Sequence, residues 1–227
     1  MKNEKKTNGN QQTQAANNNT ELVFIIDKSG SMSGYEKDTI GGFNSMIEKQ
    51  KSGEGEVYVS TVLFNSESEV IHDRVRISEI APMTEDDYQA DGYTALLDAV
   101  GDAVHHIRNV HKYARAEDIP AHTIFVITTD GMENASRRYS PTRVKKMIKK
   151  QTDECGWEFI FVGANIDSIG MADDIGIRRE RAANYTQSSA GYEECYSSMC
   201  RFVTMKRARA TEAAGDAWKS ALKKNEK

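Results

Sequence analysis

The chain has 227 residues, of which 38% are hydrophobic, and this length fits one domain with additional segments. Its 30 basic and 34 acidic residues give a net charge of −4, so no strong basic field favours nucleic acid or an anionic membrane as a partner. The longest purely apolar runs, at residues 22–26 and 124–127, are too short to cross a bilayer.

The two ends of the chain differ in composition from its middle. Residues 1–20 contain only Met1, Ala15 and Ala16 from the apolar set, which is too little apolar surface to offset the entropy lost on ordering. Residues 208–227 are polar, rich in alanine and basic. We therefore predict a disordered polar tail over 1–20, one domain over 21–207 and a basic tail with helical character over 208–227.

The first half of the predicted domain contains strands and one helix. The continuous apolar run 22–26 is typical of a strand that is buried on both faces of a parallel sheet. Apolar residues at helical spacing over 40–47 predict a helix. Residues 57–64 and 70–75 predict two more strands, and the short link between them implies an antiparallel hairpin at one edge of the sheet.

The second half continues the alternation of helices and strands. We predict a helix from about Thr94, a strand over 123–129, a helix that starts at Ser140 and Pro141, a strand over 159–162, a weaker strand over 182–185 and a last helix from Ser188. This order predicts an α/β fold: a doubly wound, mostly parallel sheet with one antiparallel edge strand and helices on both faces.

Two of the predicted strands run into an aspartate at the same edge of the sheet. Asp27 follows the first strand, with Ser29 and Ser31 close behind, and Asp130 follows the strand over 123–129. Thr94 opens the helix between them. Loops at the switch point of such a sheet lie close together, so two carboxylates and three hydroxyls are expected around one crevice. Ligands that are all oxygen suit a hard cation, with Mg²⁺ or Mn²⁺ favoured.

The order Asp-x-Ser-x-Ser, then Thr, then Asp on this fold resembles the metal-ion-dependent adhesion site of von Willebrand factor A (vWA) domains. Residues 39–51, 128–136 and 157–165 are also similar to small stand-alone intracellular vWA proteins of bacteria and their phages. The resemblance covers residues 21–185, and all five metal positions are present.

In vWA domains the two serines and the threonine coordinate Mg²⁺, the aspartates act directly or through water, and an acidic side chain of a partner commonly fills the open position. The resemblance therefore implies that Ser29, Ser31 and Thr94 are hydroxyl ligands and that Asp27 and Asp130 are carboxylate or outer-shell ligands. It implies a metal-dependent protein-binding (adaptor) module whose partner presents Asp or Glu to the ion.

Four further residues flank the predicted metal loops. Glu133 and Asn134 follow Asp130 and are candidates for tuning the site, with solvation of the loop as the alternative interpretation. Tyr35 and Tyr93 are candidates for a rim that a partner touches, although exposed aromatic residues in loops also occur without a role.

Other interpretations stay open. Asp27 and Ser29 also fit ordinary helix capping. A Mg²⁺-dependent phosphoaspartyl transferase places an aspartate like Asp27 at the end of its first strand, but its second carboxylate would stand at Ser29. We expect no enzyme, with a metal-dependent phosphohydrolase as the alternative. Basic residues over 137–150 offer either a second interaction surface or a solvated helix face. Three cysteines without a CxxC pair favour a reduced, cytoplasmic protein.

Overall fold

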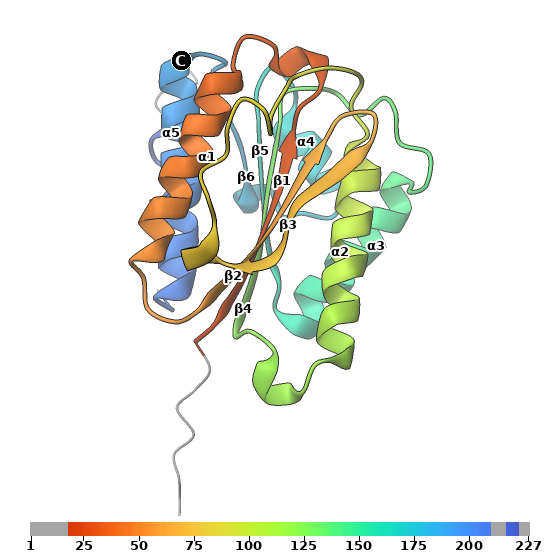
Figure 1. Cartoon of the computed structure of the whole chain (residues 1–227). Coiled ribbons are helices and arrows are strands. Elements are labelled where there is room, and N and C mark those ends of the chain that lie inside the picture. The colour runs from red at the N-terminus through yellow and green to blue at the C-terminus, as the bar shows by residue number, and fades with distance from the viewer. Residues whose placement is uncertain (1–17, 210–216, 223–227) are drawn as a thin grey trace, which may run out of the picture.

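A six-stranded sheet forms the centre of the molecule, with helices on both of its faces (Figure 1). The computed structural model describes residues 18–209 and 217–222. Within these residues the strands are β1 (Thr20–Asp27), β2 (Val57–Phe64), β3 (Ser68–Arg76), β4 (His122–Thr129), β5 (Glu158–Gly163) and β6 (Ala182–Asn184). Their order is β3-β2-β1-β4-β5-β6, and only the edge pair β2 and β3 is antiparallel. The predicted fold class is confirmed.

Side chains of the central strand β1 alternate between two hydrophobic cores. Leu22, Phe24 and Ile26 belong to the core under one face of the sheet, and Val23 and Ile25 belong to the core under the other. All eight residues of β1 are buried, because the strand has a neighbour on each side and helices over each face. A strand in this position is marked by a continuous apolar run and not by alternation.

Helices cover both faces of the sheet. The helices are α1 (Glu36–Lys51), α2 (Leu96–Tyr113), α3 (Pro141–Cys155), α4 (Ser168–Asp174) and α5 (Ser189–Arg207). α1 and α5 pack on one face, while α2 and α3 pack on the other, where the short α4 joins them (Figure 1). The sequence prediction missed α4, which has only 7 residues and connects β5 to the parallel strand β6. In the described residues, no helix is long and apolar enough to cross a bilayer.

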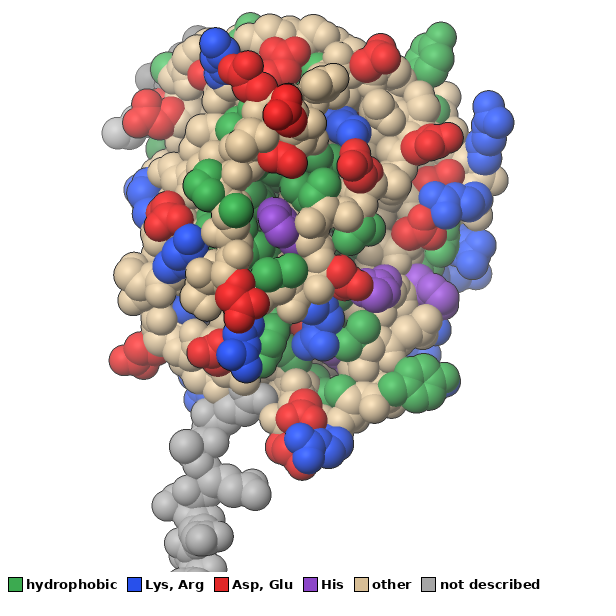
Figure 2. Space-filling model, in the orientation of Figure 1, with side chains coloured by type: hydrophobic (Ala, Val, Ile, Leu, Met, Phe, Trp, Pro, Cys, Tyr) green, Lys and Arg blue, Asp and Glu red, His purple; other side chains and the backbone are tan. Residues whose placement is uncertain are grey.

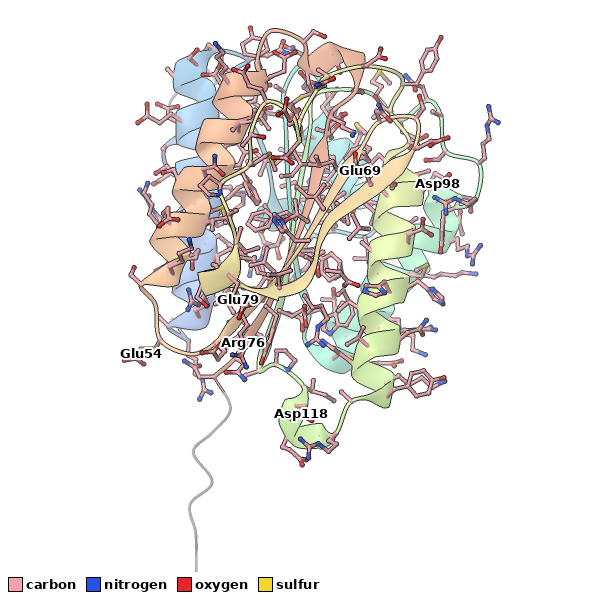
Figure 3. All side chains as sticks on the ribbon, viewed as in Figure 1. Glu54, Glu69, Arg76, Glu79, Asp98 and Asp118 are labelled. Atoms are coloured by element: carbon pink, nitrogen blue, oxygen red, sulfur yellow. The ribbon has the colours of Figure 1, made fainter. Side chains whose placement is uncertain are left out.

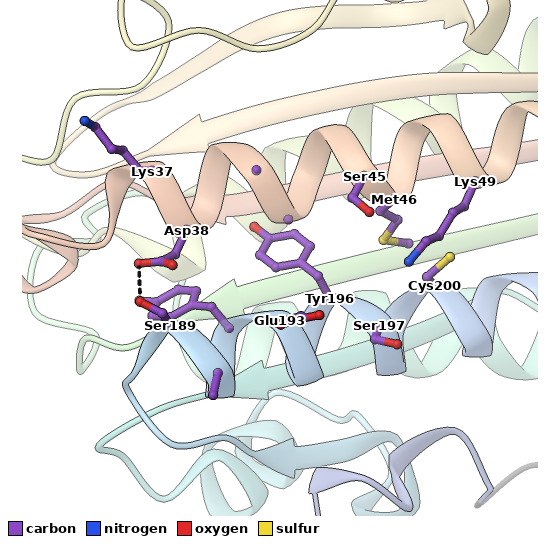
Figure 4. A pocket seen from close by; sticks show the side chains of 14 residues that line it. Lys37, Asp38, Ser45, Met46, Lys49, Ser189, Glu193, Tyr196, Ser197 and Cys200 are labelled. Atoms are coloured by element: carbon purple, nitrogen blue, oxygen red, sulfur yellow. Dashed lines mark hydrogen bonds between the residues drawn. The ribbon is translucent and has the colours of Figure 1, made fainter.

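The first and last helices run side by side and border a groove of about 480 Å³ (Figure 4). Gly42 of α1 allows this approach, because a Cβ atom there would overlap the ring of Tyr196 on α5. At the N-terminal end of α5, the Ser189 hydroxyl donates a hydrogen bond to Asp38 Oδ2 (3.3 Å; Figure 4). The start of α5 is therefore attached to the start of α1, next to the loops that follow the strands.

The C-terminal part of the chain contributes to the core beyond the predicted boundary at residue 207. Trp218 is completely buried, with its ring edge-on to Phe202 of α5 at a centroid distance of 5.6 Å, and Leu222 is also buried. Trp218 lies in a short 3₁₀ helix over Ala217–Lys219, and two apolar residues are a weak signal within a polar segment. Most of the two predicted tails, at residues 1–17, 210–216 and 223–227, lies outside the described residues.

Candidate metal centre

Asp27, the last residue of β1, is buried at the carboxyl edge of the sheet. Its Oδ1 accepts a hydrogen bond from the Ser29 backbone N–H (2.7 Å), and its Oδ2 accepts one from the Thr129 hydroxyl (2.5 Å). Its main-chain carbonyl oxygen accepts a hydrogen bond from the Tyr88 hydroxyl (2.5 Å). Burial raises the pKa of Asp27, and the hydrogen bonds from Thr129 and Ser29 offset part of this effect. The carboxylate is therefore held in one orientation, and a nearby cation would favour its charged form.

Three hydroxyl groups converge on one point beside Gly131. The hydroxyl oxygens of Ser29 and Ser31 lie 3.0 Å apart. A Cβ atom added to Gly131 would lie 2.6 Å from Thr94 Oγ1, 3.0 Å from Ser31 Oγ and 3.3 Å from Ser29 Oγ. We call this arrangement of Ser29, Ser31 and Thr94 the hydroxyl cradle. The cradle stays open because residue 131 has no side chain.

Thr94 is held in the cradle by the loop that follows β4. The Asn134 side-chain oxygen accepts a hydrogen bond from the Thr94 N–H (2.9 Å), and the Thr94 carbonyl accepts the N–H groups of Asn134 (3.0 Å) and Ala135 (3.2 Å). The Glu133 carboxylate accepts the N–H of Leu97 in the first turn of α2 (2.9 Å) and that of Ala135 (3.1 Å). Glu133 and Asn134, which the sequence suggested for tuning the site, thus position the Thr94 segment.

Asp130, which follows β4, is 4% exposed, and its two carboxylate oxygens differ in their hydrogen bonding within the described residues. Its Oδ2 accepts a hydrogen bond from Gln187 Nε2 (2.5 Å). Its Oδ1 is buried and has no hydrogen-bond partner within the described part of the chain. Burial raises the pKa of Asp130 to about 6 and repulsion by Asp27 adds to the rise, while the neighbouring Ser31 hydroxyl and the Gln187 amide oppose it. A buried carboxylate oxygen without a partner is costly, and a bound cation would remove this cost.

The residues at this edge fit a divalent cation. Asp27 and Asp130 provide two negative charges, and the hydroxyl cradle provides neutral oxygens. In residues 18–209 and 217–222, no group of three or more His, Cys, Asp or Glu residues comes together, so a metal site here depends on hydroxyl ligands. Oxygen ligands with few carboxylates suit Mg²⁺ or Mn²⁺. The structure thus brings all five residues of the predicted motif together, and their role as ligands stays a prediction.

The two tyrosines that the sequence suggested for a partner rim differ in exposure. Tyr93 is 69% exposed, and Met132, in the loop that follows β4, is 70% exposed. Tyr35 is half-buried, stacks on Tyr192 with a centroid distance of 5.1 Å and donates a hydrogen bond from its hydroxyl to the Gln187 carbonyl (3.1 Å). Of the two tyrosines, Tyr93 is the one that a partner can readily reach.

Sequence reasoning missed Gln187, Thr129 and Tyr88, the three residues that hold the two aspartates. Gln187 is 57 positions from Asp130, and Thr129 is 102 positions from Asp27. None of the three belongs to a local motif. Only one of them gave a signal in the sequence: Thr129 directly precedes Asp130, a predicted metal ligand.

Basic residues of the run over 137–150, which extends into α3, form contacts within the chain. Arg138 forms an ion pair with Asp102 (2.6 Å), and Lys145 Nζ donates a hydrogen bond to the Asp173 carbonyl (2.7 Å). Such contacts are typical of a solvated helix face.

Comparison with known proteins supports the fold. No family model and no curated protein sequence matches the chain. The solved structures that are similar to it include von Willebrand factor type A from Catenulispora acidiphila, with 14% identity over 82% of this chain and 43% of that one (TM-score 0.56). They also include mussel byssus proximal thread matrix protein 1 with a zinc-occupied metal-ion-dependent adhesion site, with 15% identity over 80% of this chain and 46% of that one (TM-score 0.54). Manganese-loaded TRAP from Plasmodium vivax has 18% identity over 77% of this chain and 71% of that one (TM-score 0.54).

These likenesses show that the chain has the vWA fold. The aligned regions of the first two structures make up less than half of their chains, at 43% and 46%.

Proposed function

We propose that the protein is a binding module that recognises an acidic residue of a partner protein through Mg²⁺ held by Asp27, Ser29, Ser31, Thr94 and Asp130. The observation that carries this proposal is the hydroxyl cradle beside a buried carboxylate oxygen, Asp130 Oδ1, that has no hydrogen-bond partner among the described residues. The two carboxylates neutralise a divalent ion, and the hydroxyl ligands add no further negative charge. An ion in such a site keeps an affinity for an anionic ligand.

Two of the similar structures hold a divalent ion, which supports a divalent ion in this protein. One has zinc in its adhesion site and the other is loaded with manganese. We propose Mg²⁺ as the resident ion because the ligands are all oxygen atoms. Mn²⁺ prefers the same kind of ligand and is the alternative.

The surface around the site restricts the kind of partner. Glu85, Asp86 and Asp87 are exposed on the loop that precedes Tyr88, and acidic side chains gather along the upper edge in Figure 2. Lys28, next to Asp27, is paired with Glu69 near the start of the β3 edge strand (2.6 Å). Glu69 is labelled in Figure 3. This surface repels a partner that is acidic throughout, so we propose that the acidic residue that binds the ion is flanked by Lys or Arg.

The same geometry disfavours the phosphohydrolase alternative. Asp27 is buried, and both of its carboxylate oxygens accept hydrogen bonds from within the chain, from Ser29 and Thr129. A nucleophilic carboxylate must reach its substrate. We therefore propose binding and not catalysis. Turnover of generic phosphoesters that is lost in Asp27→Asn would reverse this choice.

The cysteines bear on where the protein acts. All three are free, with Cys155 exposed and with Cys195 and Cys200 buried. Free thiols persist in a reducing compartment. We propose a cytoplasmic protein similar to the small stand-alone vWA proteins of bacteria and phages.

The first test is binding of Mn²⁺ to the purified protein, followed by electron paramagnetic resonance. Asp130→Asn removes the carboxylate charge at almost constant shape and should abolish binding, whereas the matched variant Asp86→Asn, on the exposed loop, should bind as the unmodified protein does. Partner capture from the native cell should then require Mg²⁺ and be lost in EDTA and in Asp130→Asn. Capture that EDTA and Asp130→Asn both leave unchanged would refute the proposal.

A further inference from the structure

Gln187, in the loop between β6 and α5, reaches across to the candidate metal centre. Its side-chain nitrogen donates hydrogen bonds to Asp130 Oδ2 (2.5 Å) and to the Ser31 carbonyl (3.2 Å). Its side-chain oxygen accepts a hydrogen bond from Asn165 Nδ2, and its main-chain carbonyl accepts one from the Tyr35 hydroxyl. One side chain thus connects four loops at the carboxyl edge of the sheet.

The backbone that follows Gln187 is also held in place. Ser188 is the N-cap of α5, and its hydroxyl accepts the Gly191 N–H (3.2 Å). Ser189 donates a hydrogen bond to Asp38 of α1, the contact drawn in Figure 4. With both helix starts fixed, the carboxamide can present its NH₂ group to Asp130 without a search through other rotamers, which lowers the entropic cost of the contact.

This contact assigns different roles to the two oxygens of the Asp130 carboxylate. Oδ2 is occupied by the Gln187 NH₂ group, and Oδ1 is buried without a partner in the described residues. A carboxylate held through one oxygen offers the other to an ion in a fixed direction.

We propose that Gln187 is a positioning residue of the metal centre and also determines its specificity for acidic ligands. It orients Asp130 so that Oδ1 is free for the ion, and because it is neutral it leaves the ion able to attract an acidic partner. This inference rests on the proposed function.

The second role follows from the charge count. Asp27 and Asp130 together balance a divalent ion. A glutamate at position 187 would have the same shape but would add a third negative charge beside Asp130. That charge would favour the cation and repel a carboxylate ligand. A carboxamide of the same size holds Asp130 without this repulsion.

The experiment compares Gln187→Ala and Gln187→Glu with the unmodified full chain. Mn²⁺ affinity is measured by electron paramagnetic resonance. Acetate, as a probe for the partner carboxylate, is titrated into the Mn²⁺-loaded protein and followed by water proton relaxation. Thr186→Ala is the matched control, because Thr186 is an exposed neighbour in the same loop. Thermal unfolding in EDTA shows whether each variant folds.

We expect Gln187→Ala to weaken Mn²⁺ binding by about 10- to 100-fold, the range found when partners of metal ligands are removed. We expect Gln187→Glu to bind Mn²⁺ more tightly than Gln187→Ala does, because both lose the NH₂ group that holds Asp130 and only the glutamate adds a charge that attracts the cation. The same charge should weaken acetate binding at least about tenfold relative to the unmodified protein. Thr186→Ala should change neither affinity.

Unchanged Mn²⁺ and acetate affinities in both variants would overturn the inference while the proposed function stands. Equal losses of both affinities in the two variants would also overturn it, because they would indicate a purely structural role. Failure of the unmodified protein to bind Mn²⁺ would instead refute the proposed function, and the inference with it.

Discussion

Replacing Gly131 by alanine places a methyl group inside the hydroxyl cradle. The added carbon would lie 2.6 Å from Thr94 Oγ1 and 3.0 Å from Ser31 Oγ. The backbone at Gly131 lies outside the left-handed region, so alanine can adopt its conformation. The substitution therefore acts on the space between the hydroxyls and leaves the path of the chain unchanged.

The size of the effect follows from these distances. Ordinary van der Waals contact begins at 3.4 Å, so the Thr94 hydroxyl would have to move by about 0.8 Å. Mg²⁺ requires nearly ideal octahedral geometry with ligand distances of about 2.0–2.1 Å, and positions in a metal site tolerate only about 0.2 Å. We expect Gly131→Ala to weaken Mg²⁺ binding at least about 100-fold, which corresponds to about 2.7 kcal/mol.

Thermal unfolding with and without Mg²⁺ measures this loss. At a Mg²⁺ concentration about 100 times the dissociation constant, binding stabilises the unmodified protein by about 2.7 kcal/mol. For a chain of this length the increase in Tm is roughly 5–10 °C. A variant that binds about 100-fold more weakly gains only about 0.4 kcal/mol at the same concentration, or roughly 1 °C.

Gly41→Ala is the matched control, because a Cβ atom at Gly41 would have no neighbour within 4 Å. This variant should keep the full Mg²⁺-dependent shift in Tm, and in EDTA it should be slightly more stable because alanine favours the helix. If Gly131→Ala showed the same Mg²⁺-dependent shift as the unmodified protein, the ion would not bind between these hydroxyls, and the geometry proposed for the site would be wrong.

Three further substitutions test contacts that support the site and the fold. Asp98→Asn should lower the free energy of unfolding by about 2 kcal/mol at pH 7, because the Asp98 carboxylate accepts the backbone N–H groups of residues 137–139, each at 2.9 Å. Burial raises the pKa of Asp98, but these N–H groups and Arg138 lower it more, so the folded state has the lower pKa. The stabilisation by the Asp98 carboxylate is therefore complete above the usual pKa of 3.8 and is lost as the pH falls through the pKa of the folded state. Urea unfolding at pH 7 and pH 3 should show that the stability difference between Asp98→Asn and the unmodified protein is smaller in acid, and a constant difference would contradict this. Arg207→Met should lower the free energy of unfolding in urea by about 3 kcal/mol, because the buried guanidinium group donates to the main-chain carbonyl (2.7 Å) and side-chain oxygen (2.8 Å) of Gln50. A loss below about 1 kcal/mol would show that water replaces these bonds. Trp218→Ala should lower the free energy of unfolding by about 3 kcal/mol in the same measurement, because Trp218 is completely buried. Unchanged stability would show that residues 217–222 behave as part of the predicted tail and not of the domain.

The fold was predictable where one local pattern decided the structure. The apolar run at 22–26 indicated a doubly covered strand, and the short link before β3 indicated the antiparallel edge. The helix α4 was missed because 7 residues carry too little periodicity, and its place is decided by the crossover from β5 to β6. Trp218 was missed because its burial depends on packing against Phe202 of α5, a contact between two elements that no local pattern reports.

The sequence by itself determined the chemical character of the site. Asp27, Ser29 and Ser31 follow one buried strand and Asp130 follows another, and the carboxyl ends of parallel strands meet at one edge. Residue types within a few positions of a strand end are therefore enough to predict two carboxylates with several hydroxyls at the same place.

Only the tertiary structure decided how these groups are held and which of their oxygens are free. Gln187 meets Asp130, and Thr129 meets Asp27, only after β1, β4 and α5 have packed. The same packing turns Tyr35 inward and leaves Tyr93 exposed. The physical reason is that periodicity reports on neighbours within one element, whereas burial and long-range hydrogen bonds depend on which surfaces of distant elements come together.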